Sequence, residues 1–170
     1  MKKERSALSV ALIGILTAVV VVFTLVVRIP TTKGYLNLCD VAICFIAFTF
    51  GPVTALLSAG LGTAIADLVS GYAQWAPISF VVHGLEGLLI ALVVRSNPNS
   101  IIRIILGALV CILTVSLGYF ALSALFISTV AVAAAEIPAN MVQAGVGVVL
   151  GLALSKAIKR AYPPVCSLSW

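Results

Sequence analysis

The sequence predicts an all-α integral membrane protein: a single domain over residues 1–170, with six transmembrane helices, a short second helix and both termini in the cytoplasm. Hydrophobic residues make up 62% of the chain and charged residues only 9%, whereas about a quarter of a soluble domain is charged. The mean hydropathy is +1.25. Residues 6–27 also form an uncharged apolar run, long enough for the roughly 20 residues that cross a bilayer as a helix.

Glycine, proline and charged residues divide the chain into apolar segments. The first helix is expected over residues 6–28, followed by a polar loop that extends to about residue 40. The later apolar segments are expected, in order, over residues 36–50, 52–70, 78–94, 101–124 and 138–161. Pro138 opens the last helix, because proline suits the first helical position. Residues 127–135 are apolar and small and receive no assignment. A cleaved signal peptide is the alternative for the first run, but the run exceeds the usual apolar length and has no small-residue cleavage site.

The second segment is too short for a simple transmembrane helix, so a re-entrant loop is a real alternative. About 15 residues at roughly 1.5 Å each fall short of the hydrocarbon thickness. If the segment spans, only Arg28 and Lys33 lie outside. The other basic residues then lie inside: Lys2, Lys3, Arg5, Arg95, Arg103, Lys156, Lys159 and Arg160. If it does not span, three basic residues lie inside and seven outside. The positive-inside rule favours the spanning arrangement.

Charge and cysteine usage exclude several other classes of protein. The net charge of +5 reflects the basic cytoplasmic loops, and no basic stripe alternates with aromatic residues as in a nucleic-acid-binding surface. The four cysteines, at positions 39, 44, 111 and 166, form no CxxC pair and have no companion histidines. We therefore expect neither a metal site nor a disulfide framework, and expect the cysteines to pack as small apolar residues.

Polar side chains concentrate at the predicted outer end of the helices, whereas the inner half is almost purely aliphatic. Their shared depth predicts a binding pocket open to the outside. The predicted substrate-binding residues are Tyr35, Asn37, Asp40, Trp75, His83, Tyr119, Glu136, Asn140 and Gln143. Asn140 and Gln143 are three residues apart and share a helical face. Two amides suit a neutral heteroaromatic ligand, because each offers a donor and an acceptor.

Each of these residues also has a purely structural interpretation. Asp40 could cap the second segment, and Tyr72 and Trp75 could belong to an interfacial aromatic belt. The negative charge of Glu136 could interact favourably with the positive N-terminal end of its helix dipole. The two amides could hold helices together, as could an Asp67–His83 hydrogen bond. We expect Asp67 to join the third and fourth helices beside the pocket. We expect Glu86, the deepest group, to be a structural residue paired with His83 or a backbone donor.

An enzyme and a channel are the competing functional classes. His83 and Glu86 have the spacing of a metal-ligand pair on a helix, but His83 is the single histidine and no nucleophile, base or phosphate-binding loop accompanies it. No catalytic and no metal-binding residue is therefore predicted. A channel or solitary permease would need polar residues through the inner half as well. A chain that binds from outside without a path or an energy source needs partner subunits.

Four stretches resemble a known family over nearly the whole chain. They are "IPTTKGYLNLCDVAI", "FGPVTALLSAGLGTAIADLVSGYAQWAP", "VVHGLEGLL" and "IPANMVQAGVGVVLGLALSKAIKR". They look like the S components of energy-coupling factor (ECF) transporters, most closely the group for hydroxymethylpyrimidine and related vitamin precursors. The resemblance implies six helices in a prokaryotic cell membrane and a vitamin bound between the first outer loop and helices four to six. It also implies no cofactor, and transport with a transmembrane T subunit and two ABC-type ATPases that use the ATP.

Two further details follow from this resemblance. Ala7 and Ala11 match the small-residue pair through which S components dock on the T subunit, where small side chains let two helices approach closely. Gly147 and Gly151 repeat that spacing and could serve internal packing. Where relatives tend to carry lysine before "GLEG", this chain has His83, whose imidazole can be neutral. This difference disfavours an anionic ligand. The ligand that the resemblance implies is a thiamine-precursor pyrimidine or a B6-like ring.

Overall fold

The computed structural model describes residues 2–31 and 35–168, with side chains from Ala7 onward. Lys33, assigned above to the outer loop, lies outside the described residues, as do the side chains of Lys2, Lys3 and Arg5. The elements are α1 (Lys2–Val26), β1 (Ile29–Pro30), β2 (Tyr35–Leu36), α2 (Cys39–Phe50), α3 (Pro52–Val69), α4 (Ala76–Val94), α5 (Ile101–Phe126), α6 (Val130–Ala135), α7 (Ile137–Ala161) and a 3-10 turn, η1 (Pro163–Leu168).

The helices confirm the segments expected from the sequence, within a few residues at each end. Within the described residues, five segments are long and apolar enough to cross a membrane: Ala7–Val26, Pro52–Val69, Ala76–Val94, Ile101–Phe126 and Val130–Ala161. The short second helix is also present, with 12 residues in α2. The apolar stretch that received no assignment forms α6, which the side chain of Thr129 caps by accepting a hydrogen bond from the Val132 N–H. The protein is an all-helical membrane protein, apart from the β1–β2 hairpin.

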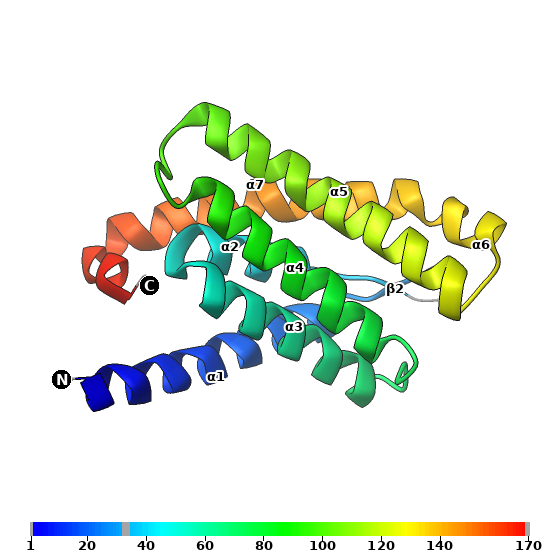
Figure 1. Ribbon diagram of the computed structural model, residues 1–170, viewed down its shortest axis with the longest axis horizontal. Coiled ribbons are helices and arrows are strands. Elements are labelled where there is room, and N and C mark those ends of the chain that lie inside the picture. Colours follow the sequence, from blue (N-terminus) through cyan, green and yellow to red (C-terminus); the bar gives the residue numbers. More distant parts are fainter. Residues whose placement is uncertain (1, 32–34, 169–170) are drawn as a thin grey trace.

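Successive helices run back and forth along the long axis of the molecule. Both termini and the α4–α5 loop lie at one end, and the hairpin, the α3–α4 turn and α6 lie at the other (Figure 1). Gly51 makes the turn from α2 into α3 with a φ of 95°, a conformation that glycine adopts at little cost. Pro52 then starts α3 in the first helical turn. The turn brings α3 back alongside α2 with no intervening loop.

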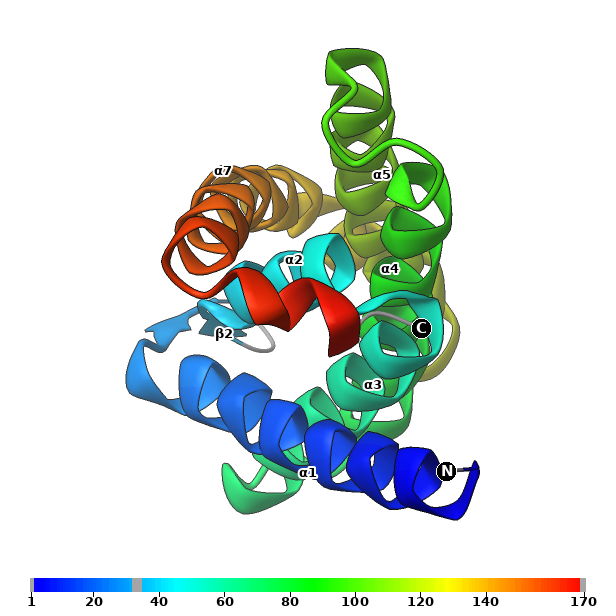
Figure 2. The same ribbon diagram turned by 90° about the vertical axis from the view of Figure 1, so that its left-hand side faces the viewer.

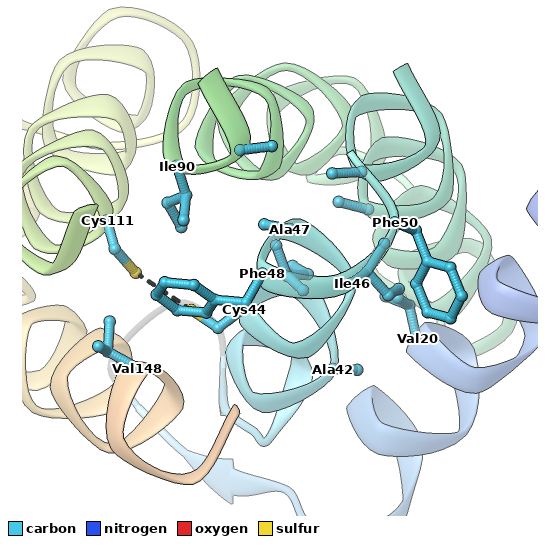
Figure 3. Packing of buried hydrophobic residues seen from close by; sticks show 14 of the residues in the cluster. Val20, Ala42, Cys44, Ile46, Ala47, Phe48, Phe50, Ile90, Cys111 and Val148 are labelled. Carbon is cyan, nitrogen blue, oxygen red and sulfur yellow. Dashed lines mark hydrogen bonds between the residues drawn. The ribbon is translucent and has the colours of Figure 1, made fainter. Parts of the chain in front are cut away.

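The short helix α2 occupies the centre of the bundle, with α1, α3, α4, α5 and α7 around it (Figure 2). All of its residues except Phe45 are buried, as expected for a helix that is apolar on every side. Its side chains reach neighbours in several directions: Cys44 points to Cys111 of α5, and Ile46 points toward Val20 of α1 (Figure 3). Its central position makes α2 the reference against which the surrounding helices pack.

Two glycines of α7 allow this helix to lie directly on α2. A Cβ added at Gly147 would lie 2.3 Å from the Cβ of Asp40, and one added at Gly151 would lie 2.6 Å from the Cβ of Cys44. Both distances are far shorter than a carbon–carbon contact of about 3.5–4.0 Å. The internal-packing role considered for this pair is confirmed. Gln143, one turn before Gly147, is thereby placed on the face of α7 that meets the start of α2.

Candidate functional site

A cavity lies at the hairpin end of the bundle, between the hairpin, α3, α4, α5, α6 and α7. The residues that line it are Thr31, Tyr35, Leu36, Asn37, Asp67, Trp75, Ser79, His83, Tyr119, Ser123, Ala133, Glu136, Asn140 and Gln143. The fold therefore brings eight of the nine predicted substrate-binding residues to one cavity, from segments more than one hundred residues apart. Asp40 is the exception. Ser79 and Ser123 also line the cavity but were missed, because serine is common in transmembrane helices and carries no distinctive pattern.

Aromatic rings form much of the cavity wall. The ring of Tyr119 lies 5.9 Å from that of Trp75 and 5.4 Å from the imidazole of His83, measured between centroids. The Tyr119 hydroxyl and Ser79 Oγ are 2.7 Å apart and share a hydrogen bond. This bond holds the Tyr119 ring, on α5, against α4. Tyr35 packs against Tyr72, with centroids 5.1 Å apart. A flat, largely apolar ligand would find ring faces on more than one side.

Asp67 connects α3 to the hairpin. The Tyr35 hydroxyl donates to Asp67 Oδ1 over 2.9 Å. Burial, and then the nearby Asp67 carboxylate, raise the pKa of the Tyr35 hydroxyl above its usual range, so the hydroxyl stays protonated and acts as the donor. Asp67 was expected to join α3 to α4; its shortest hydrogen bond runs to the hairpin, and Ser79 of α4 also lies beside it. The alternative Asp67–His83 bond is absent from the hydrogen bonds of the described residues, because His83 Nδ1 faces other carboxylates.

His83 and two carboxylates form a buried network directly beneath the cavity. His83 Nδ1 lies 2.7 Å from Glu86 Oε2 and 3.4 Å from Asp40 Oδ1. The predicted His83–Glu86 pair is therefore confirmed. All three side chains are at most 2% exposed, and ionisable groups inside a membrane domain are expected to pair with one another in this way.

Asp40 lies in this network rather than in the cavity wall. It was expected to contact the ligand or to cap α2, yet it does not line the cavity and makes no side-chain cap at the start of that helix. Its Oδ2 atom instead accepts a 2.7 Å hydrogen bond from Gln143 Nε2. Asp40 lies in the first turn of the central helix, so its carboxyl group points into the bundle. There His83 and Gln143 provide its partners.

The two amides of α7 take different roles. Gln143 uses both of its polar atoms inside the protein: Oε1 accepts from the backbone N–H of Asn37 over 2.8 Å, and Nε2 donates to Asp40. Asn37 Oδ1 in turn accepts from the backbone N–H of Cys39 over 2.7 Å. Gln143 thus connects α7 both to the segment after the hairpin and to the start of α2. Asn140 lines the same cavity one turn earlier and makes no side-chain hydrogen bond within the described part of the chain, so its donor and acceptor can meet a ligand.

Three cysteines gather around the same network, contrary to expectation. Cys39 Sγ lies 3.6 Å from His83 Nε2, and Cys111 Sγ donates to Glu86 Oε1 over 3.2 Å. Cys44 Sγ lies 3.9 Å from Cys111 Sγ. The prediction that the cysteines have no companion histidine was therefore wrong, because α2, α4 and α5 bring together residues that are distant in sequence. Cys39, Asp40 and His83, and separately Cys44, Glu86 and Cys111, are close enough to hold a metal ion, although hydrogen bonds already join the members of each group.

Comparison with known proteins assigns the chain to a family. A family model described as "ECF-type riboflavin transporter, S component" matches residues 4–160. A protein of Pyrococcus woesei, described as "Uncharacterized protein in gap 3'region", is 33% identical over 148 residues, which cover 86% of this chain and 98% of the relative. The thiamine precursor transporter HmpT of Lactococcus lactis subsp. cremoris (strain MG1363) is 31% identical over 133 residues, which cover 78% of this chain and 75% of the relative.

The family match extends from α1 to α7 and includes every residue that lines the cavity. The resemblance seen in the sequence is thus confirmed, and the cavity lies in a transporter subunit rather than in an enzyme. The chain belongs to the family of S components of ECF-type vitamin transporters.

Proposed function

We propose that this chain captures a small heteroaromatic vitamin or vitamin precursor in the cavity at its hairpin end and delivers it inward. The single observation that carries the proposal is the composition of the cavity wall, which combines several aromatic rings with the amide of Asn140 and the carboxyl of Asp67. The thiamine precursor transporter among the relatives supports a ring of the hydroxymethylpyrimidine type. A B6-like ring is the second ligand of the same class. The energy for transport comes from a T subunit and two ATPases that hydrolyse ATP.

The size of the cavity favours a single ring over a three-ring flavin, even though the family model carries the name of riboflavin. The cavity measures about 70 Å³, less than the roughly 150 Å³ of an engineered cavity that admits benzene. Any aromatic ring therefore requires the walls to move, and a single ring requires less movement than a three-ring flavin.

In the proposed membrane arrangement α2 completes six crossings, both termini are cytoplasmic and the cavity opens outward. The alternating direction of the helices in Figure 1 supports this arrangement. The basic residues at the end that holds both termini support it as well, under the positive-inside rule. Among the described residues these are Arg95, Arg103, Lys156, Lys159 and Arg160, with Arg28 at the hairpin end.

Cysteine labelling tests this arrangement. Asn99 lies in the α4–α5 loop and Gln74 in the α3–α4 turn, and both are exposed. A Cys166→Ser background removes the one exposed cysteine among the four. In this background Asn99→Cys should react with an impermeant maleimide only from the cytoplasmic side, and Gln74→Cys only from outside. Reversed labelling would mean that the end with both termini lies outside and that the cavity faces the cytoplasm, which would exclude the proposed arrangement.

The docking face for the T subunit is proposed at Ala7 and Ala11 of α1. Both residues are exposed, and a Cβ added at Gly14, about one turn further on, would meet no atom within 4 Å. Ala7→Trp combined with Ala11→Trp should abolish co-purification with the partner subunits and vitamin uptake, because two bulky side chains prevent close helix approach. The affinity of the isolated chain for its ligand should not change, since these residues lie far from the cavity.

The matched control is Leu113→Trp with Leu117→Trp. These two leucines have the same spacing and are also exposed, but they lie on α5. The control variant should assemble and transport normally. An Ala7/Ala11 variant that still purifies as an active complex would exclude this docking face.

A further inference from the structure

Asp67 lines the cavity, and one of its carboxyl oxygen atoms is buried without a partner from the protein. The side chain is only 6% exposed and belongs to the cavity lining. Oδ1 accepts the hydrogen bond from Tyr35, whereas Oδ2 has no hydrogen-bond partner among the described residues. A buried carboxyl oxygen without a donor is unfavourable. At the wall of a ligand cavity, a donor group on the ligand can supply the missing hydrogen bond.

None of the polar groups described around Asp67 donates a hydrogen bond to Oδ2 in this arrangement. The hydroxyl of Tyr35 is used on Oδ1. Ser79, across the cavity on α4, shares its hydroxyl with Tyr119. His83 directs Nδ1 at Glu86 and Nε2 toward Cys39. No lysine or arginine lines the cavity within the described residues, so no fixed cation there competes with a ligand for Asp67.

We propose that Asp67 Oδ2 accepts a hydrogen bond from an amino group on the ligand, which makes the substrate an amino-substituted nitrogen heteroaromatic ring. An amino group on such a ring supplies the N–H donor that Oδ2 lacks, while Oδ1 keeps its hydrogen bond from Tyr35. Tyr119 and Trp75 then contact the ring. This inference rests on the proposed function and selects between its two ligand classes, because the thiamine-precursor pyrimidine carries such an amino group and pyridoxine does not.

A pair of probes that differ at one substituent tests the inference. The probes are 4-amino-5-hydroxymethyl-2-methylpyrimidine and its 4-oxo analogue. In the analogue a carbonyl acceptor replaces the amino donor at position 4, and the proton moves to a ring nitrogen. Calorimetric titration of the purified full-length chain should show the amino ring binding about ten- to a hundredfold more tightly, since the oxo ring places an acceptor against Oδ2. Pyridoxine should bind as weakly as the oxo ring.

Asp67→Asn should reverse this preference. The amide oxygen of asparagine can still accept from Tyr35, while its NH₂ group replaces Oδ2 as a donor. We therefore expect the variant to bind the oxo ring more tightly than the amino ring. Tyr35→Phe is the control: it removes the bond to Oδ1 but leaves Oδ2, so affinity falls for both rings and the preference for the amino ring remains.

The outcomes separate this inference from the proposed function. Equal binding of the two rings by the unmodified chain, or equal weakening of both by Asp67→Asn, would overturn the role of Asp67 while leaving a small-ring transporter subunit intact. Tighter binding of pyridoxine would overturn it as well. If the unmodified chain bound none of the three probes, both the inference and the proposed ligand class would fail. The comparison on the unmodified chain needs no variant, so it remains decisive even if Asp67→Asn folds poorly.

Discussion

Gly147→Leu should strongly destabilise the protein and abolish ligand binding, because it separates α7 from the central helix. The new Cβ would lie 2.3 Å from Asp40 Cβ and 2.9 Å from the Asp40 carbonyl carbon. The second of these atoms belongs to the backbone of α2, so a change of rotamer cannot relieve the clash. Overpacking usually costs about 1–3 kcal/mol when side chains can shift, and a clash with backbone should lie at or above the upper end of that range.

The effect of Gly147→Leu should be measured as the thermal unfolding midpoint in detergent, with Gly145→Leu as the control. Two positions earlier on α7, Gly145 would meet no atom within 4 Å of an added Cβ. Replacing glycine by leucine improves helix propensity by roughly 1 kcal/mol in both variants. The difference between their unfolding midpoints therefore reports the clash of the new side chain at position 147 with α2 alone. At about 2–4 °C per kcal/mol, Gly147→Leu should unfold several degrees lower than Gly145→Leu. Equal midpoints would show that α2 and α7 do not pack as described.

Hydrophobicity together with glycine, proline and charged residues was sufficient to predict the long helices and the short second helix, but not α6. The short second helix followed from an apolar run between a polar loop and Gly51-Pro52, and α2 occupies those residues. The depth of each polar side chain followed from counting residues along its helix, which is why eight predicted residues meet at one cavity. Depth depends on the rise of the helix per residue, and the sequence contains this information directly.

The sequence did not predict in the same way how each helix is rotated about its own axis, or which helices pack against one another. Asp40 has the depth of a cavity residue, but the packing of α2 at the centre of the bundle turns it away toward His83 and Gln143. The cysteines looked unrelated because their partners lie on other helices. The spacing of Asp40 and Cys44, four residues apart on one helical face, was the one available signal. The hydrogen bond from Tyr35 to Asp67 was not predicted, because the two-residue strands of the hairpin left no recognisable pattern.

Asn140→Leu should weaken ligand binding without affecting the fold. The Asn140 side chain lines the cavity and makes no hydrogen bond within residues 2–31 and 35–168. Removing its amide leaves a desolvated ligand atom unpaired, which costs about 1–3 kcal/mol, or roughly a five- to 150-fold loss of affinity. The thermal unfolding midpoint should not change, because no protein group loses a partner.

Gln143→Leu on the same face should instead lower both affinity and stability. The substitution removes the acceptor for the Asn37 N–H and the donor to Asp40, and each group left without a partner in a buried site costs about 1–3 kcal/mol. The hairpin and the start of α2, which shape the cavity, then lose their connection to α7. The two leucine variants therefore distinguish a group that contacts the ligand from one that positions the cavity wall.

Calorimetric titration of the unmodified chain and these two variants with 4-amino-5-hydroxymethyl-2-methylpyrimidine tests the proposed cavity most directly. We expect saturable binding of one ligand per chain, weakened in both variants, with a lower unfolding midpoint in Gln143→Leu alone. Unchanged affinity in both variants would contradict the proposal: the amides would then serve only to hold helices together, and the ligand would bind outside this cavity.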